Sequence, residues 1–399
     1  MATDPGLEIP GQLIYDARKM DISMGPIVKL AVIFLLALPL VAAGRPPAGA
    51  ADKPHKLADA LLARIGSVRE PGAGIIVLKD GKVVYLGTRG VGDMQGMRPI
   101  DGRTTFRLAS VTKQFTAAAV MLLVRDGRLR YEDSLTDIFP DFPEYGRAIT
   151  VRHLLNHTSG LPDYEDLMSP VDPSVPVGEA QIDDAGVLEL LKGQKAGWFA
   201  PGALWRYSNS GYVLLGLIVE KISGLSFPMF LRERIFAPLR MTNTVAFVRG
   251  RASVPDRAFG YSKDGGRWRF TDQSPTSATL GDGGVYSSLY DLTLWDEALR
   301  RHILLGEADM KPALTPVRVP GKGPTGPDGR PADYGFGWFL DAWQGHPRMW
   351  HYGETVGFRT AIQRFTADGL TVIVLANRSD LDAAEMALKV AGFYLKGEK

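Results

Sequence analysis

Apolar runs near both ends of the chain predict β-hairpins. Residues 74–79 (GIIVLK) and 82–87 (KVVYLG) are rich in β-formers and flank an Asp-Gly pair, which favours a tight hairpin turn. Residues 359–365 and 370–376 repeat this pattern around a second Asp-Gly pair. Helical periodicity follows at 382–395. Each end of the chain therefore predicts a hairpin together with a helix.

Between the hairpins the pattern is helical and loop-rich. Helical periodicity is found at residues 110–126, 151–156, 184–192, 210–223, 227–235 and 288–301. The sequence thus predicts an α+β fold: an antiparallel sheet from the N- and C-terminal segments, flanked by helices, with a largely helical inserted region. The sheet-containing part is assigned to 51–105 plus 334–399 and the helical part to 106–333. Two proline-rich segments, 161–178 and 311–333, are expected to be binding loops or plain surface excursions.

An apolar run near the N-terminus predicts an export signal. Residues 30–43 (LAVIFLLALPLVAA) are too few to span a bilayer comfortably, follow Lys29 and precede an Ala-x-Ala pattern. The residues before the run are acidic on balance, so Met20 or Met24 fits better as the start of a signal. We assign residues 1–50 to a signal peptide and expect a periplasmic or secreted protein with no stable membrane anchor after cleavage. The alternative is a buried core helix.

Composition narrows the possible chemistry. The 399 residues carry a net charge of only +2, so no electrostatic attraction to nucleic acid is expected. Cysteine is absent, which excludes disulfides, cysteine-ligated zinc, a cysteine nucleophile and Cys-linked lipid anchors. His153 and His157 have the spacing of a metal pair, but no H-E-x-x-H pattern or third ligand accompanies them. Helix-end capping and core packing explain them better, and we expect no metal or cofactor.

The first candidate for catalysis is the segment from Ser110 to Lys113 at the start of a predicted helix. Residues three apart lie on one helix face, and a desolvated lysine can be neutral and accept the serine proton. The helix N-terminus would also favour a developing oxyanion. Alone this motif is weak, because a capping serine and a solvated lysine fit it equally well. The chain holds no other S-x-x-K pattern.

The second candidate is Tyr207-Ser-Asn209, which precedes an apolar helix. A neighbouring ammonium such as that of Lys113 would favour the phenolate form, so Tyr207 could share the role of base. The Asn209 amide is able to hold both a lysine and a substrate carbonyl. The alternative is a core tyrosine followed by a helix-capping asparagine.

The third candidate is the segment His351-Tyr-Gly353-Glu354, just before the C-terminal hairpin. A hydrogen-bonding residue followed two positions later by glycine on a strand lets a substrate backbone lie close. The amides of Glu354 and Ser110 would then form an oxyanion hole. Taken alone, a turn with an exposed histidine is the simpler interpretation.

In this order and spacing, the three motifs resemble the active-site elements of the penicillin-recognising serine hydrolases. This superfamily includes class C β-lactamases, D-alanyl-D-alanine peptidases, D-aminopeptidases and family VIII carboxylesterases. Longer blocks extend the resemblance over nearly the whole chain after the signal, at residues 106–116, 149–162, 201–212, 281–288 and 351–358. The resemblance implies a β-lactamase/transpeptidase-like fold.

The resemblance also implies a role for each matching residue: nucleophile Ser110, proton-handling pair Lys113 and Tyr207, positioning residue Asn209, and substrate-strand element His351 and Gly353. The third motif departs from the family, since β-lactamases commonly carry Lys-Thr-Gly there. A permanent cation is replaced by a group that is mostly neutral at pH 7. Efficient β-lactam hydrolysis is therefore in doubt, whereas esterase or peptidase chemistry is not.

We therefore expect an exported serine hydrolase that forms an acyl-enzyme on Ser110, with its site at the seam between the sheet and the helical region. Its expected substrates are small esters, amides or peptides, as for a carboxylesterase or a D-amino-acid peptide hydrolase. A β-lactamase or D-alanyl-D-alanine carboxypeptidase is the alternative. A non-catalytic homologue that binds a ligand or partner is the rival of another class. The sequence does not predict an oligomeric state.

Overall fold

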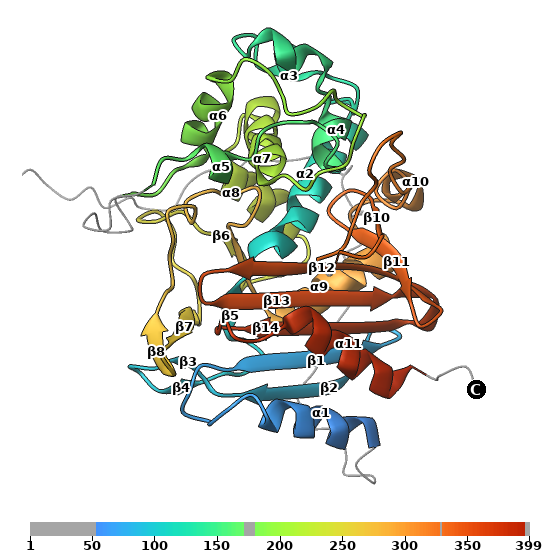
Figure 1. Ribbon diagram of the computed structural model, residues 1–399. Helices are drawn as coiled ribbons and strands as arrows, with labels where there is room; N and C mark the ends of the chain where they lie inside the picture. The colour runs from blue at the N-terminus through green and yellow to red at the C-terminus, as the bar shows by residue number, and fades with distance from the viewer. Residues whose placement is uncertain (1–52, 171–179, 328, 396–399) are drawn as a thin grey trace, which may run out of the picture. The chain divides into compact units, whose positions relative to one another are not determined.

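The computed structural model describes residues 53–170, 180–327 and 329–395 (Figure 1). The predicted signal segment, residues 1–50, lies outside these described residues. The described residues form one compact unit.

A seven-stranded antiparallel sheet organises this unit, with the strand order β10-β11-β12-β13-β14-β1-β2. Its strands are β1 (Ala73–Lys79), β2 (Lys82–Arg89), β10 (Asp333–Tyr334), β11 (Phe339–Trp343), β12 (His346–Thr355), β13 (Phe358–Phe365) and β14 (Leu370–Ala376). The blue strand β1 lies beside the red strand β14 (Figure 1), with Ala73 opposite Ala376 and Lys79 opposite Leu370. Strands from both ends of the chain therefore pair directly, and the predicted α+β fold is confirmed.

Helices flank the sheet, and most of them lie in the part of the chain between the N-terminal strands and the C-terminal strands (Figure 1). They are α1 (Lys53–Ala63), α2 (Lys113–Arg125), α3 (Leu135–Ile138), α4 (Val151–Leu155), α5 (Tyr164–Leu167), α6 (Asp184–Lys192), α7 (Asn209–Ser223), α8 (Phe227–Leu231), α9 (Leu289–Arg300), α10 (Glu307–Met310) and α11 (Ala383–Tyr394). Short 3₁₀ turns are η1 (Ala109–Thr112), η2 (Glu144–Ala148) and η4 (Thr366–Asp368), and η3 (Arg232–Phe236) is a π-helical turn.

Three small sheets complete the described part of the chain. They pair β3 (Val91–Asp93) with β4 (Arg98–Pro99), β7 (Tyr261–Asp264) with β8 (Arg267–Phe270), and β9 (Val285–Ser288) with both β5 (Thr105–Arg107) and β6 (Val245–Ala246). Within the described residues, no single helix has the length and apolar composition of a bilayer span. The bent pair Asn209–Ser223 and Phe227–Phe236 meets that test only when its two helices are counted together.

The alternation of side chains along β1 explains how one sheet joins two hydrophobic cores. Ile75 and Val77 pack into a core shared with α1 and α11. Ile76 and Leu78 belong to the larger core, which contains α2, α7 and α9. The β1-β2 turn lies at Asp80 and Gly81, whose φ angles of 52° and 76° are those of the tight hairpin turn that Asp-Gly favours.

Two predicted helices differ in detail from the structure. The predicted helix 110–126 begins as the 3₁₀ turn η1, and the α-helix starts at Lys113. The Thr112 hydroxyl accepts a hydrogen bond from the Val285 amide of β9 at 3.1 Å, which ties this turn to the neighbouring strand. The predicted helix 227–235 is divided between α8 and η3.

Candidate active site

Ser110 lies in η1, between the end of β5 and the start of α2. The residue before it, Ala109, has a φ of +48°, a left-handed conformation that costs energy for a residue with a Cβ atom. The Leu108 amide donates to the Val285 carbonyl at 2.8 Å, and the Thr360 hydroxyl donates to the Leu108 carbonyl at 2.7 Å. Strands β9 and β13 therefore hold the segment that carries the candidate nucleophile.

Lys113 is fully buried beneath Ser110. Its ammonium donates to the Ser110 hydroxyl at 3.0 Å, to Asn209 Oδ1 at 2.8 Å and to the Asp282 carbonyl oxygen at 3.0 Å. Burial lowers the pKa of Lys113 to about 8, although Asp282 and other nearby carboxylates oppose the shift. When Lys113 is neutral, it keeps two N–H donors and has one lone pair for a proton. The predicted Ser-Lys pair is thus brought together in a site that favours proton transfer.

Tyr207 lies against Lys113, with Nζ 4.9 Å from the centre of the phenol ring. Ser110 lies within hydrogen-bonding reach of the hydroxyl, and this contact favours the phenolate. Burial has the larger effect and raises the pKa of Tyr207. Our expectation that Lys113 would favour a phenolate base is therefore wrong, because desolvation of the phenolate outweighs the Ser110 hydrogen bond and the nearby carboxylates raise the pKa of Tyr207 further.

His351 is on β12 but is fully buried. Its Nδ1 lies 2.7 Å from the Tyr352 carbonyl oxygen, which requires a proton on Nδ1, and its Nε2 then accepts from the Tyr334 hydroxyl at 3.2 Å. Burial, and then the charge of Lys113, lowers the pKa of His351 to about 3. The ring is neutral and both of its nitrogens have protein partners. The alternative of an exposed turn is therefore wrong, because His351 is buried, while its part in substrate binding stays a prediction.

Gly353 allows a close approach of two segments of the chain, and the approach of a substrate backbone at this residue stays a prediction. A Cβ atom at this position would lie 2.1 Å from the Leu108 carbonyl oxygen and 2.5 Å from Thr360 Oγ1. The missing side chain thus lets β12 pack against the segment that precedes Ser110. On its other edge, β12 pairs with β11 only from His346 to Trp350.

A small cavity of about 50 Å³ opens beside Ser110, which is room for a few water molecules. Its lining includes three of the predicted residues, Ser110, Asn209 and Glu354. The amides of Ser110 and Glu354 remain our predicted oxyanion hole, and both residues border this cavity. The other lining residues were not among the predicted site residues, and they are Arg107, Ala109, Tyr164, Glu165, Thr276, Thr279, Asp282, Gly283 and Thr355. Tyr164 and Glu165 come from the first proline-rich segment, which therefore contributes to the site.

Carboxylates are prominent around this cavity. Asp282 is 6% exposed; its Oδ2 accepts from the Tyr164 hydroxyl at 3.1 Å, and its Oδ1 has no partner among the described residues. Burial raises the pKa of Glu165, and the charges of Asp163 and Asp282 raise it further. The block at residues 281–288 was the only sequence signal near Asp282, since a single aspartate in a glycine-rich turn has no signature of its own.

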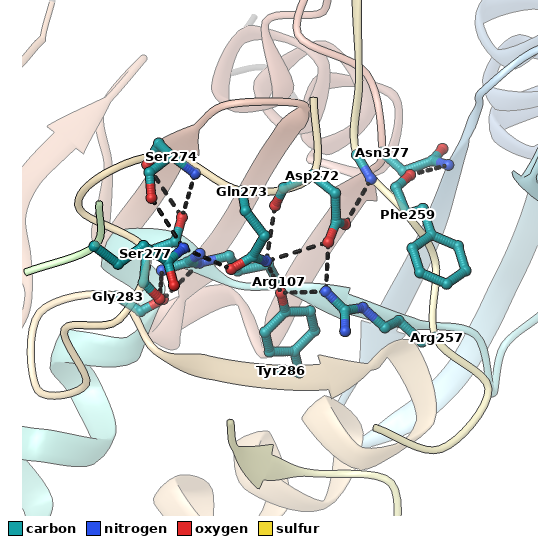
Figure 2. A network of polar contacts seen from close by, with 12 residues as sticks. Arg107, Arg257, Phe259, Asp272, Gln273, Ser274, Ser277, Gly283, Tyr286 and Asn377 are labelled. Atoms are coloured by element: carbon teal, nitrogen blue, oxygen red, sulfur yellow. Dashed lines mark hydrogen bonds and ion pairs between the residues drawn. The ribbon is translucent and has the colours of Figure 1, made fainter. Parts of the chain in front are cut away.

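A polar network holds the cavity wall that carries Asp282 (Figure 2). Arg107 donates to the carbonyl oxygens of Ser277 and Gly283 at 3.1 and 3.3 Å. Further along the same segment, Asp272 forms an ion pair with Arg257 and accepts from the Gly260 amide at 2.9 Å. The wall is thus fixed at both ends by charged side chains.

The two histidines considered as a metal pair have other partners. His153 Nδ1 accepts from the Thr150 amide at 3.2 Å as part of a capping box at the start of α4. His157 Nδ1 accepts from the Ser208 amide at 3.2 Å. Within the described residues, no group of three metal-ligating side chains is present.

Comparisons with known proteins agree with the resemblance seen in the motifs. The family model described as Beta-lactamase matches residues 57–393. The chain is 32% identical over 357 residues to penicillin-binding protein 4* of Bacillus subtilis, covering 85% of this chain and 75% of that protein. It is 30% identical over 325 residues to a D-aminopeptidase of Brucella canis, covering 80% of this chain. The match spans only 58% of that aminopeptidase.

Among solved structures, the D-amino acid amidase of Ochrobactrum anthropi SV3, complexed with L-phenylalanine amide, is similar throughout. The TM-score is 0.69 at 26% identity, with 86% of this chain and 95% of the amidase covered. The arrangement of η1, α2, α7 and β12 around the cavity therefore belongs to a fold that is shared over almost the whole described chain.

Proposed function

Because the chain belongs to the Beta-lactamase family of penicillin-recognising serine hydrolases, we propose that it hydrolyses small amides and esters through an acyl-enzyme on Ser110. The observation that carries the proposal is the hydrogen bond of 3.0 Å between buried Lys113 and Ser110. A lysine whose pKa is lowered to about 8 is partly neutral near pH 7 and is a suitable base for a serine hydroxyl.

In the proposed acylation step, neutral Lys113 donates to Asn209 and to the Asp282 carbonyl oxygen, and its lone pair accepts the Ser110 proton. The Ser110 oxygen bonds to the substrate carbonyl carbon, and the carbonyl electrons move to oxygen. When the tetrahedral intermediate collapses, the bond to the leaving group breaks. Tyr207, a neutral phenol, passes a proton from Lys113 to the departing nitrogen or oxygen.

The amides of Ser110 and Glu354 are proposed to stabilise the negative oxygen of this intermediate. Water then attacks the acyl carbon and gives its proton to the pair Lys113 and Tyr207. The bond between the acyl carbon and Ser110 Oγ then breaks. Ser110 recovers its proton and the acid product leaves. No step in this cycle needs a cofactor.

We further propose that the preferred substrates carry a free ammonium group next to the scissile bond. Three acidic residues line the cavity, Glu165, Asp282 and Glu354, and of these Glu354 also lies 3.8 Å from Arg359 in an ion pair. Burial raises the pKa of Glu165, and the neighbouring carboxylates of Asp163 and Asp282 raise it further, so a substrate ammonium beside Glu165 would stabilise its charged form. The Arg107 guanidinium donates hydrogen bonds to the backbone carbonyl oxygens of Gly283 and Ser277, and His351 is neutral. This distribution of charge suits the D-aminopeptidase and D-amino acid amidase named above better than a β-lactamase that binds an anionic substrate.

The test compares alanine p-nitroanilide, in its D and L forms, with the N-acetylated compounds. We expect a higher kcat/KM for a free-amine substrate, and Glu165→Gln should lower that preference about fivefold, as for loss of an exposed ion pair of ~1 kcal/mol. Asp166→Asn is the matched control, since Asp166 is also on α5 but does not border the cavity. Equal turnover of free and acetylated substrates would contradict ammonium recognition. No turnover of any of them, with p-nitrophenyl acetate also inert, would contradict the hydrolase proposal.

A further inference from the structure

His157 contacts both the ring of Tyr207 and the backbone next to it, and the proposed mechanism uses none of these contacts. The side chain is 1% exposed, and its ring packs on the Tyr207 ring with centroids 4.4 Å apart. The backbone of His157 has a φ of +61°. A non-glycine residue in this conformation costs about 1 kcal/mol or more, and such positions concentrate at functional sites.

His157 also binds the backbone on both sides of Tyr207. Its carbonyl oxygen accepts from the Arg206 amide at 3.0 Å, and its Nδ1 accepts from the Ser208 amide at 3.2 Å. One residue therefore fixes the peptide groups before and after the candidate proton carrier. The ring packing then sets the position of the phenol itself.

These contacts require one particular form of the imidazole. Because Nδ1 accepts a hydrogen bond from an amide, the ring proton must lie on Nε2, and the ring must be neutral. Nε2 has no hydrogen-bond partner among the described residues. Around the ring lie Trp205, Tyr212 and Tyr334, with centroids 5.9, 5.1 and 4.7 Å away. Burial and the nearby Lys113 and His351 hold the pKa of His157 well below its usual value, in agreement with the neutral form.

We propose that His157 is a positioning residue for catalysis, which holds the Tyr207 hydroxyl against Ser110 and Lys113 by fixing the backbone on both sides of it. This inference rests on the proposed function of the site. A displacement of about 1 Å in a reacting group can lower a rate about 100-fold. Loss of His157 Nδ1, which accepts the hydrogen bond of the Ser208 backbone amide, should therefore lower kcat while affecting KM little.

Two substitutions separate this role from simple packing. His157→Leu keeps buried volume but removes the acceptor for the Ser208 amide. His157→Asn loses the ring but places an amide oxygen near the position of Nδ1, and asparagine tolerates the left-handed backbone. With alanine p-nitroanilide, we expect the kcat of the leucine variant to be about 100-fold below that of wild type. The kcat of the asparagine variant should be about tenfold above that of the leucine variant. If the leucine variant does not fold, the asparagine variant still provides the comparison with wild type.

The decisive measurement is a double-mutant cycle with Tyr207→Phe. If His157 acts through Tyr207, adding either His157 substitution to the phenylalanine variant should change kcat less than twofold. His153→Asn is the control, because His153 caps α4 and should leave kcat unchanged in both backgrounds. Additive losses in the cycle, or a His157→Asn enzyme no better than His157→Leu, would overturn the inference. Equal activity of wild type and Tyr207→Phe would instead contradict the role of Tyr207 in the proposed function.

Discussion

At the scale of single residues, the site depends on how burial changes proton affinity. Burial lowers the pKa of Lys113 to about 8 but raises that of Tyr207. The two groups therefore receive different roles: Lys113 takes the serine proton, and Tyr207 passes a proton on as a neutral phenol. Sequence alone left these roles open, because the S-x-x-K and Y-x-N patterns do not report how deeply each group is buried.

The assignment of Lys113 as base predicts a specific dependence of activity on pH. The neutral amine is the active form, so kcat/KM should rise with pH and level off above an apparent pKa of about 8. p-Nitrophenyl acetate is the right substrate, since it has no ammonium that titrates in the same range. Tyr207→Phe should lower the plateau and leave the apparent pKa in place. A rate that falls as the pH increases from 7 to 9, with the enzyme still folded, would rule out a lysine base.

The surroundings of His351 could not be predicted from the sequence. The motif places His351 in the substrate-strand element, but it does not report that both ring nitrogens have protein partners, the Tyr334 hydroxyl and the Tyr352 carbonyl oxygen. Position in a motif indicates which strand a residue is on, not which neighbours its side chain meets. Glu165 was not predicted as a site residue for the same reason, because its proximity to Ser110 depends on segments far apart in the chain.

At the scale of helices and strands, periodicity predicted the helices α2, α4, α6, α7, α9 and α11 and the hairpin strands β1, β2, β13 and β14, but not α1 or the strands of the three small sheets. The Asp-Gly turns predicted the β1-β2 and β13-β14 hairpins, since this pair strongly favours tight turns. The 3₁₀ turn at Ser110 was not predictable from periodicity. It depends on contacts of Leu108 and Thr112 with Val285, which lies far along the chain.

Asn377, directly after β14, connects segments from both ends of the chain. Its side chain accepts from the Gly72 amide at 2.8 Å and donates to the carbonyl oxygens of Val91, Gly92 and Phe259 at 3.1, 3.3 and 2.9 Å. Asn377→Leu would remove this partner from the Gly72 amide and from the Val91 and Phe259 carbonyl oxygens, at about 1–3 kcal/mol for each, whereas the Gly92 carbonyl keeps the bond from the Phe259 amide. We expect the free energy of unfolding to fall by roughly 3 kcal/mol or more.

Urea denaturation of the purified variant measures this change. Asn243→Ala is the control, since the side-chain bonds of Asn243 are longer and exposed, and it should shift the free energy by less than about 1 kcal/mol. A similar small shift for Asn377→Leu would show that Asn377 does not tie these segments together.

At the scale of the whole molecule, the described chain combines strands from both ends with a helical region in between. The sheet and its terminal origin were predictable from the two similar hairpins. The direct pairing of β1 with β14 was not, because hairpin patterns do not specify which edges of the hairpins meet.

Export remains a proposal at this scale, and it rests on the apolar run at residues 30–43 and the Ala-x-Ala pattern after it. Expression of the full chain in a Gram-negative host, followed by N-terminal sequencing of the periplasmic protein, tests it. We expect a mature N-terminus close to Ala51. Recovery of only uncleaved protein in the cytoplasm would contradict export.

The central claim is that Ser110 forms the covalent intermediate, and active-site labelling tests it most directly. A fluorophosphonate probe should add its mass once to wild-type protein, on the peptide that contains Ser110. Labelling should be slower by about 100-fold or more in Lys113→Ala, as expected for loss of a general base, and absent in Ser110→Ala. A label that persists in Ser110→Ala, or that maps to another residue in wild type, would contradict the account.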